Sequence, residues 1–457
     1  MDAVTTDVII YAAGTAMLGS VLFFFIGLIA GTSETATIAP ATLLVVLLGA
    51  PPEACFSFCI AAIIAKHITH AVPTAMLGIP GDAMAVPLLE PCGIMRKLGV
   101  PHVALQKMIS AGVIASLLVI PASVLFGAIL AQFFGFVKDY AGLIFIVVAV
   151  VLAFFSKARW ANLVILIPFA LVIFGLNQVA LKVAGKKLVI CMFMGLAMGP
   201  MMVDLLCSLV PNLRKNMETD KPREAWLAPP LKNWKGYLPN PLKMLTRRQK
   251  MYSVANVIVS CFLFTFSAVG VTIIIGEWVR KMYKSAYARA SSMAAIMNGA
   301  TESTYLAEVI IPLVAFGLPL SPIAMGVGLP LFNAPPVFTT EPMHNLHTLM
   351  TPMTFLFFGM LAAIVASILI YPLAMNYARP ASYWVSKNIS QEAILGMFAG
   401  LIIVLAYFEA GWIGVFIAFT MGFFGGILGK FFSMNIGVQF MIFYASPHIV
   451  RYIWGVS

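Results

Sequence analysis

Charged residues are scarce in this chain. Asp, Glu, Lys and Arg make up 10% of its 457 residues, whereas hydrophobic residues make up 61% and the mean hydropathy is +0.98. Soluble domains carry about 25% charged residues, so a water-soluble fold of this length could not cover its surface with so few charges. A lipid bilayer removes that requirement, because the solvent around the outer helices is itself apolar. The composition excludes a soluble enzyme and predicts an all-α polytopic membrane protein.

Long apolar runs support this class. A membrane-spanning helix needs about 20 mainly apolar residues. Apolar runs lie at 8–30, 105–134, 142–155, 161–176, 188–209, 252–276, 354–371, 393–407 and 411–428. Shorter stretches, or stretches broken by proline and glycine, lie at 38–50, 54–77, 306–331 and 436–450. Together they predict about 12 membrane helices, including interrupted or re-entrant segments.

Motifs for metal binding, disulfides and secretion are also lacking. The six cysteines form no Cys-x-x-Cys pair and lie mostly in apolar runs, so we expect small buried side chains. Glu341, His344 and His347 have the spacing of metal ligands on a helix, but the surrounding sequence is typical of a loop. The first residues lack the basic region of a signal peptide, so we expect the first apolar run to be retained as a helix. No metal or cofactor is expected apart from a coupling ion.

Signatures of intramembrane hydrolases are missing as well. Residues 79–82 (Ile-Pro-Gly-Asp) lack the first glycine of Gly-x-Gly-Asp, and His-Glu-x-x-His does not occur. We therefore expect a transporter and no enzyme. An intramembrane hydrolase and a membrane channel are the alternatives. A channel would conduct without an imposed gradient, whereas a coupled carrier needs one.

One basic polar segment lies in the middle of the chain. Residues 210–251 carry many Lys and Arg side chains, against only Glu218, Asp220 and Glu224. Cytoplasmic loops are enriched in Lys and Arg, so this segment is assigned to the cytoplasm, and we expect no nucleic-acid partner. The predicted organisation is a first transmembrane repeat at 1–210, a basic cytoplasmic loop at 211–250 and a second transmembrane repeat at 251–457.

The two halves contain similar motifs. Residues 73–80 and 312–319 both follow Pro-x-x-x-x-Gly-[Ile/Leu]-Pro, and residues 31–34 (Gly-Thr-Ser-Glu) weakly resemble 300–303 (Ala-Thr-Glu-Ser). If each half holds an odd number of crossings, the halves are inverted repeats and both termini lie outside. We therefore predict two inverted repeats around the central loop.

The Gly-x-Pro segments predict interrupted helices. Proline breaks a helix and glycine allows a tight backbone path. The exposed backbone groups are tolerable at membrane depth only where they line a cavity or are covered by protein. The start of the next half-helix offers oriented N–H groups to an anionic substrate. A single motif of this kind is an ordinary proline kink, but paired interruptions in two halves favour a binding site.

Three carboxylates lie near these segments. Glu34 stands between two apolar runs, and Glu302 stands among hydroxyl and amide side chains. Carboxylates within a membrane are costly, so these two either face a cavity on an ion or proton path or lie solvated at the interface. Asp82 either caps a helix start or binds the coupling ion.

Three basic side chains precede the first interruption on one helical face. Lys66, His67 and His70 either anchor a carboxylate or relay protons, or they lie at the membrane interface.

The motifs resemble a known family. Residues 78–81 (Gly-Ile-Pro-Gly), residues 89–99 (Leu-Glu-Pro-Cys-Gly-Ile-Met-Arg-Lys-Leu-Gly) and residues 311–319 (Ile-Pro-Leu-Val-Ala-Phe-Gly-Leu-Pro) are similar to segments of the large permease subunit of tripartite tricarboxylate transporters. The resemblance implies a permease of the bacterial or archaeal inner membrane, driven by a Na⁺ or H⁺ gradient. It also implies carboxylate substrates and two partners, a small four-helix membrane subunit and a soluble substrate-binding protein.

The chain departs from the family pattern at three places. Residues 29–34 replace a Leu-Pro-Gly-x-Gly segment, Leu320 replaces a glycine, and Glu302-Ser303 stand where Asn-Asn is common. Two site positions thus gain carboxylates, which oppose a trianion. The change indicates a divergent member with proton coupling, or with a less acidic or even cationic substrate.

The sequence thus predicts a secondary active transporter for a small organic anion, with alternating access and a possible homo-oligomeric state. The predicted substrate-binding residues are Thr32, Ser33, Gly78, Pro80, Gly81, Ser303, Gly317, Pro319 and Ser321. The predicted coupling-ion residues are Glu34, Asp82 and Glu302.

Overall fold

The structure is a computed structural model that describes residues 5–29, 32–133, 135, 140–155, 159–186, 188–212, 232, 234–332, 346–388, 391–434 and 436–454. Within these residues every regular element is a helix. The all-α membrane class is therefore confirmed. Glu341 and His344 lie outside the described residues, and His347 lies beside the Leu313 carbonyl oxygen, 3.1 Å from its Nδ1. All six cysteines are free and five are buried, as predicted.

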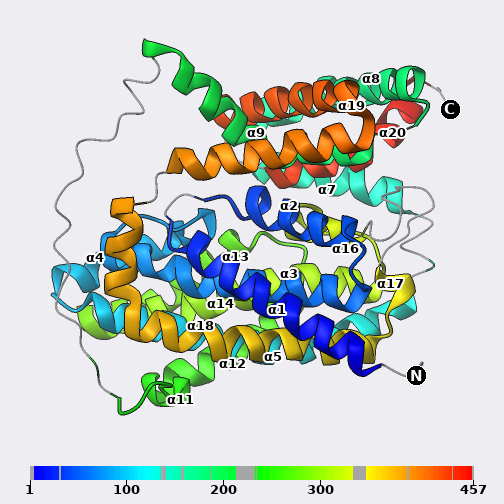
Figure 1. The fold of residues 1–457 in the computed structure, drawn as a ribbon. Helices are drawn as coiled ribbons and strands as arrows, with labels where there is room; N and C mark the ends of the chain where they lie inside the picture. Colours follow the sequence, from blue (N-terminus) through cyan, green and yellow to red (C-terminus); the bar gives the residue numbers. More distant parts are fainter. Residues whose placement is uncertain are drawn as a thin grey trace.

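The helices form two layers, which lie one above the other in Figure 1. The lower layer contains α1 (Thr6–Gly27), α3 (Pro52–Val72), α5 (Pro101–Leu130), α12 (Arg247–Phe262), α13 (Ala268–Met282), α14 (Ala286–Ala315) and α18 (Pro352–Asn388). The upper layer contains α7 (Ala141–Phe155), α8 (Arg159–Ala184), α9 (Val189–Leu209), α19 (Gln391–Phe431) and α20 (Ile436–Trp454).

Short helices connect these elements. Between α3 and α5 lie η1 (Pro73–Leu77), η2 (Ala83–Leu88) and α4 (Leu89–Lys97), and η3 (Ala131–Phe133) follows α5. The others are α2 (Glu34–Leu47), α11 (Pro241–Met244), α15 (Pro322–Met325), α16 (Leu329–Phe332) and α17 (Leu346–Leu349). Helix α2 contacts α3 in the lower layer and both α9 and α19 in the upper layer. It therefore joins the two layers.

Two helices form the centre of the lower layer. Helix α14 packs along α5, and α3 packs along both α1 and α18. Every described residue of α14 from Ala290 to Ala315 is buried, as is every residue of α3 from Ala54 onward. These two helices also carry five of the polar residues singled out from the sequence, which therefore lie inside the protein: Lys66, His67, His70, Glu302 and Ser303.

Six of the described helices are long and apolar enough to cross a membrane. Helix α14 is not among them, although it has 30 residues and is central, because residues 298–308 in its middle include one Asn, two Thr, one Ser and two Glu. A buried helix does not need an apolar surface facing lipid. The total of about 12 membrane helices and the inverted repeats therefore stay predictions.

Both interruptions predicted from the Gly-x-Pro motifs are present. The first lies after η1, where Gly78 has φ of +77° and ends the helix. The second lies after α14, where Gly317 has φ of +59°. Both values lie in the left-handed region, which glycine adopts without the steric cost that a side chain imposes.

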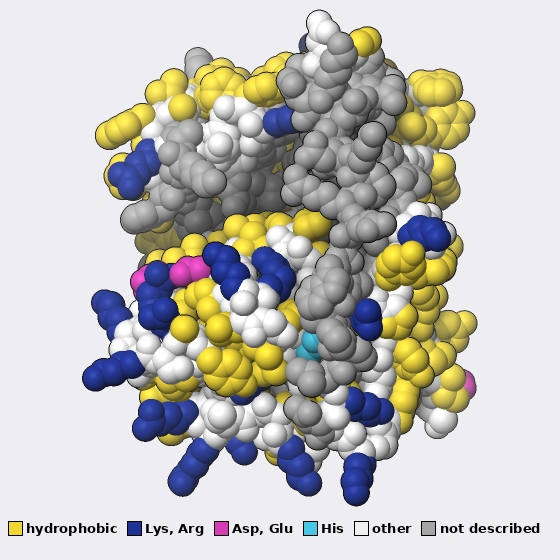
Figure 2. Space-filling model, turned by 90° about the vertical axis from the view of Figure 1, so that its left-hand side faces the viewer, with side chains coloured by type: hydrophobic (Ala, Val, Ile, Leu, Met, Phe, Trp, Pro, Cys, Tyr) yellow, Lys and Arg dark blue, Asp and Glu magenta, His cyan; other side chains and the backbone are white. Residues whose placement is uncertain are grey.

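One end of the molecule is basic. Figure 1 shows α4 and α11, which carry Arg96, Lys97 and Lys243, at the left-hand end, while α1 begins and α20 ends at the right. Figure 2 looks at the left-hand end and shows Lys and Arg side chains spread across the lower part of this face. Helix α12 begins at Arg247, so the last residues of the predicted 211–250 loop are helical.

Candidate functional site

The site begins at the start of α2. Ser33 is the N-cap of this helix, and its side chain accepts a hydrogen bond from the backbone N–H of Ala36 at 3.4 Å. The cap places Glu34 in the first turn, where the helix dipole favours a carboxylate. The residue is buried, with 6% of its surface exposed. The alternative of a solvated interfacial Glu34 is therefore wrong.

His67 of α3 lies between two carboxylates. Its Nε2 is 2.6 Å from Oε1 of Glu34, and its Nδ1 is 2.7 Å from Oε2 of Glu302, which lies in the middle of α14. The side chains of His67 and Glu302 are almost fully buried as well. The ring of Tyr305, one turn along α14, packs edge-on against the imidazole with centroids 4.5 Å apart. The structure thus joins two predicted coupling residues through a histidine. We call Glu34, His67 and Glu302 the buried triad.

The two short contacts limit how many protons the triad can hold. A neutral imidazole has one N–H donor and one acceptor nitrogen, whereas an imidazolium has two donors. If both carboxylates are ionised, His67 must be the imidazolium. If His67 is neutral, the carboxyl group facing its acceptor nitrogen must itself be protonated. In either case the triad carries two protons and a net charge of −1, and losing one proton breaks one hydrogen bond.

A second histidine–carboxylate pair lies beside the triad. His70 follows one turn after His67, and the two rings stack with centroids 5.1 Å apart. Its Nδ1 is 2.7 Å from Oδ2 of Asp82. The other oxygen of Asp82 accepts the backbone N–H of Ala85 at 3.0 Å, so Asp82 also caps η2. Asp82 therefore serves both as a helix cap and as a partner of His70.

The pair and the triad are close enough for one cation to contact both. Ligand atoms of Glu34, His70 and Asp82 lie within 4.8 Å of one another, and all three residues are buried. Within the described part of the chain, Nε2 of His70 is buried and has no hydrogen-bond partner. An imidazole nitrogen or a carboxylate oxygen can bind either a proton or a metal ion.

Lys66 is also fully buried, which excludes the interfacial alternative for this residue. Its Nζ donates to the Thr32 carbonyl oxygen at 2.9 Å and to the Thr37 hydroxyl at 3.3 Å. The hydroxyl of Thr32 bonds instead to carbonyl oxygens at the end of α1. Lys66 therefore fixes the start of α2 against α3, and it supplies a cation beside the carboxylates.

The first interruption packs against this cluster through Gly81. A Cβ atom at position 81 would lie 2.6 Å from Cβ and 2.7 Å from the carbonyl oxygen of His70. The Gly81 N–H donates to the Thr74 hydroxyl at 3.2 Å. Gly78 and Pro80 are partly exposed, and the guanidinium of Arg96 lies directly against Gly78. The first interruption thus places the Arg96 guanidinium against Gly78 and packs the backbone of Gly81 tightly against His70.

The second interruption is organised around Glu308, which the sequence analysis did not single out. The Ser321 hydroxyl donates to the Glu308 carbonyl oxygen at 2.7 Å and accepts the Ala324 N–H at 3.0 Å. The Glu308 carboxylate accepts the Ile323 N–H at 3.3 Å and is fully buried. Gly317 and Pro319 are buried next to this turn. The sequence signal that could have identified Glu308 is that it is an acidic residue within an apolar stretch, six positions after Glu302.

Ser303 points away from the triad. Its hydroxyl lies 2.9 Å from that of Ser260 on α12, and it also donates to the Gly299 carbonyl oxygen. The Thr301 hydroxyl similarly lies 2.8 Å from that of Thr272 on α13. This face of α14 therefore uses its hydroxyls to pack against neighbouring helices.

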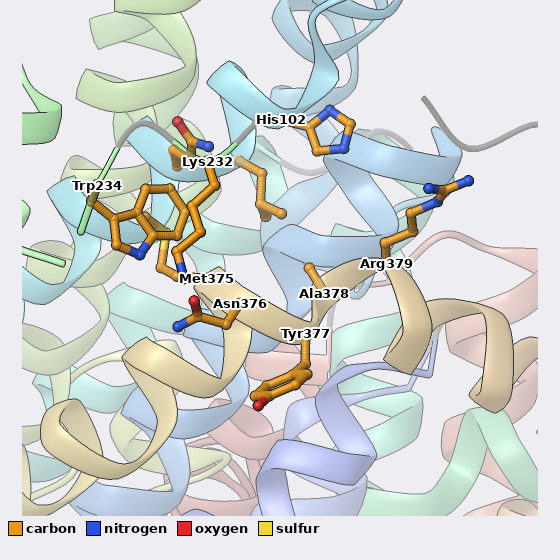
Figure 3. Close-up of a pocket in the computed structure, with 10 residues that line it drawn as sticks. His102, Lys232, Trp234, Met375, Asn376, Tyr377, Ala378 and Arg379 are labelled. Atoms are coloured by element: carbon orange, nitrogen blue, oxygen red, sulfur yellow. The ribbon is translucent and has the colours of Figure 1, made fainter. Parts of the chain in front are cut away.

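A pocket of about 320 Å³ lies elsewhere, between α5, α18 and the side chains of Lys232 and Trp234 (Figure 3). It contains none of the predicted site residues. Its lining residues are His102, Leu105, Gln106, Lys232, Trp234, Met375, Asn376, Tyr377, Ala378 and Arg379.

Comparison with known proteins gives one match. The family described as "Tripartite tricarboxylate transporter TctA family" matches residues 14–437, which is nearly the whole chain. No curated protein and no solved structure matches the chain significantly.

Proposed function

Because the chain belongs to the tripartite tricarboxylate transporter TctA family, we propose that it is a permease that couples the uptake of a small organic anion, a carboxylate, to the inward movement of protons. The observation that carries the proposal is the buried triad of Glu34, His67 and Glu302. Ionisable side chains within a membrane protein mark ion or proton paths. A histidine held between two carboxylates suits a proton better than a sodium ion, which would need oxygen ligands around it.

The triad offers a way to link proton binding to movement. Its bonds connect α2, α3 and α14, so the two halves of the chain meet at His67. When one proton leaves, a ring nitrogen of His67 without a hydrogen faces an ionised carboxylate, and the hydrogen bond between them is lost. The helix that carries this carboxylate then loses its link to α3. The remaining charged and titratable groups near His67 are Lys66, His70, Asp82 and Tyr305. Proton binding would favour the arrangement in which α2, α3 and α14 are joined at His67, and proton release would favour their separation.

The pattern of helix packing supports two inverted repeats. Helix α5 packs along α14, and α18 packs along α3; likewise α1 contacts α18, and α12 contacts α5. In the upper layer α9 packs on α19, and α20 packs on α7 and α8. If α1, α3 and α5 of the first half correspond to α12, α14 and α18 of the second, each of those lower-layer contacts has a counterpart: α5–α14 corresponds to α18–α3, and α1–α18 corresponds to α12–α5. Such matched contacts are expected for two copies of one unit. Alternating access would move one unit against the other.

The acidic site indicates substrates with few negative charges. Glu34, Glu302 and Asp82 oppose a trianion, whereas Lys66 and Arg96 can attract one or two carboxylate groups. We therefore expect a mono- or dicarboxylate. As in the family's tripartite systems, we expect a soluble substrate-binding protein and a small membrane subunit as partners, and the cytoplasmic membrane as the location.

The proposal is tested by uptake into proteoliposomes. Labelled mono-, di- and tricarboxylates are offered with H⁺ and Na⁺ gradients imposed separately, for wild type, Glu34→Gln and Glu302→Gln. Glu53→Gln is the matched control, because Glu53 is an acidic residue near the start of α3 outside the triad. We expect accumulation driven by the H⁺ gradient in wild type and control, and none in the two triad variants. Accumulation driven by Na⁺ alone contradicts proton coupling, and uptake that only equilibrates indicates a channel.

A further inference from the structure

The pocket at the basic end is chemically distinct from the triad. Its lining includes Lys232, Arg379 and His102, and none of the described residues that line it is acidic. Figure 3 shows Lys232 and Trp234 on one side of the pocket and His102 and Arg379 on the other, above the stretch of α18 around Ala378. Two cationic side chains, Lys232 and Arg379, and the imidazole of His102 thus line one pocket from three separated parts of the chain. This arrangement selects an anion.

The floor of the pocket adds to the positive potential. His102 and Gln106 belong to the first two turns of α5, a 30-residue helix that begins at Pro101. The N-terminus of a helix carries a partial positive charge. Both side chains are 7% exposed, so a ligand reaching them would be largely removed from water.

A buried donor in the pocket lacks an acceptor. Within the described part of the chain, the indole N–H of Trp234 is buried and has no hydrogen-bond partner. The ammonium of Lys232 lies over the same indole ring, 5.7 Å from its centroid. An unsatisfied buried donor costs free energy unless a ligand accepts its hydrogen bond. A ligand that satisfies the indole N–H must therefore offer a hydrogen-bond acceptor, and the adjacent Lys232 ammonium favours an acceptor that belongs to an oxyanion.

The surroundings of the pocket indicate its depth in the membrane. Tyr377 lines the pocket and is 50% exposed, and Tyr237, Tyr383 and Trp384 nearby in the chain are exposed to a similar degree. Exposed tyrosines and tryptophans gather at the level of the lipid head groups. Leu105 and Met375 supply apolar lining, which a free inorganic anion would not need. An amphiphilic anion fits both features.

From these features we infer that this pocket binds the phosphate group of an anionic lipid in the leaflet at the basic end of the protein. Arg379 and Lys232 hold the phosphate from opposite sides, the Trp234 N–H donates to one of its oxygens, and Leu105 and Met375 contact the glycerol and upper acyl chains. Basic pockets between helices on the cytoplasmic side are known to suit such head groups. The inference is independent of the proposed proton coupling.

Native mass spectrometry of the detergent-solubilised full chain tests the inference. Phosphatidylglycerol, phosphatidylcholine and inorganic phosphate are titrated separately. We expect phosphatidylglycerol to bind more tightly than phosphatidylcholine. The Lys232→Gln/Arg379→Gln variant should bind phosphatidylglycerol about 25-fold more weakly, because each cation contributes about 5-fold. Trp234→Phe keeps an aromatic side chain but removes the indole N–H, and it should weaken binding about 5-fold.

The matched control removes two cations from the same end outside the pocket. Lys243→Gln/Arg248→Gln changes the net charge equally, and both residues are exposed, Lys243 in α11 and Arg248 in the first turn of α12. It should bind phosphatidylglycerol as wild type does. Equal binding of both lipids, or equal losses in the two double variants, overturns the inference. Displacement of the lipid by inorganic phosphate or by a transported carboxylate at equal concentration also overturns it, and assigns the pocket to a free anion.

Discussion

Gly81 shows how closely the first interruption packs against the histidines of α3. A methyl group at this position would lie 2.6–2.8 Å from the Cβ, Cα and carbonyl oxygen of His70. Because these are backbone-proximal atoms that cannot move aside, Gly81→Ala should lower the free energy of unfolding by about 1–3 kcal/mol. The measurement is thermal unfolding in detergent.

Gly175→Ala is the control for that substitution. Gly175 lies in α8, and a Cβ there would meet nothing within 4 Å. Replacing a helical glycine by alanine in open space should raise stability or leave it unchanged. Equal stability of the two variants would contradict the close contact at Gly81.

Single residues were partly predictable from sequence. Glu34, Glu302 and Asp82 stood out because carboxylates are rare in apolar sequence, and all three are buried in the structure. The bridge through His67 was not predictable, because it requires three helices to meet. Glu308 was missed for the same reason, since its role depends on the turn that follows α14.

Among the helices, α12 carries its own start signal. The Thr246 hydroxyl accepts the Gln249 N–H at 3.3 Å, and the Gln249 side chain accepts the Thr246 N–H at 3.0 Å. This reciprocal capping box stabilises the helix start. Thr246→Ala should lower the free energy of unfolding by about 1 kcal/mol, measured by chemical or thermal denaturation, because the cap oxygen is lost. Thr246→Ser retains that oxygen and should behave as wild type; a loss as large in the serine variant would argue against the cap.

Helices with strong local signals could be predicted, and helices defined by burial could not. Proline and glycine act locally, so the breaks after η1 and α14 followed from the sequence motifs. Helix α14 is different, because its Ser and Thr residues bond to α12 and α13. Its central position depends on those tertiary contacts, which the hydropathy pattern does not reveal.

For the whole molecule, the charge distribution predicts its orientation. Lys and Arg side chains are spread across one end, where α11 lies, whereas α1 begins at the opposite end. Since cytoplasmic loops are enriched in these residues, a cysteine introduced at Lys243 should face the cytoplasm and one at Asp7 should face outside. Impermeant thiol reagents on intact cells should label only the second. Five of the six native cysteines are buried, so their background is small. Labelling of both positions from the same side would contradict the predicted orientation.

The central claim is that protons move with substrate through the buried triad. It is tested most directly by a pH-sensitive dye trapped in proteoliposomes without any imposed gradient. Adding a carboxylate that is accumulated in the uptake assay should acidify the interior with wild type. Glu302→Gln should still exchange labelled for unlabelled substrate but should cause no acidification, because the neutral amide cannot take up a proton. Substrate uptake without acidification in wild type, or normal acidification in Glu302→Gln, would contradict the account.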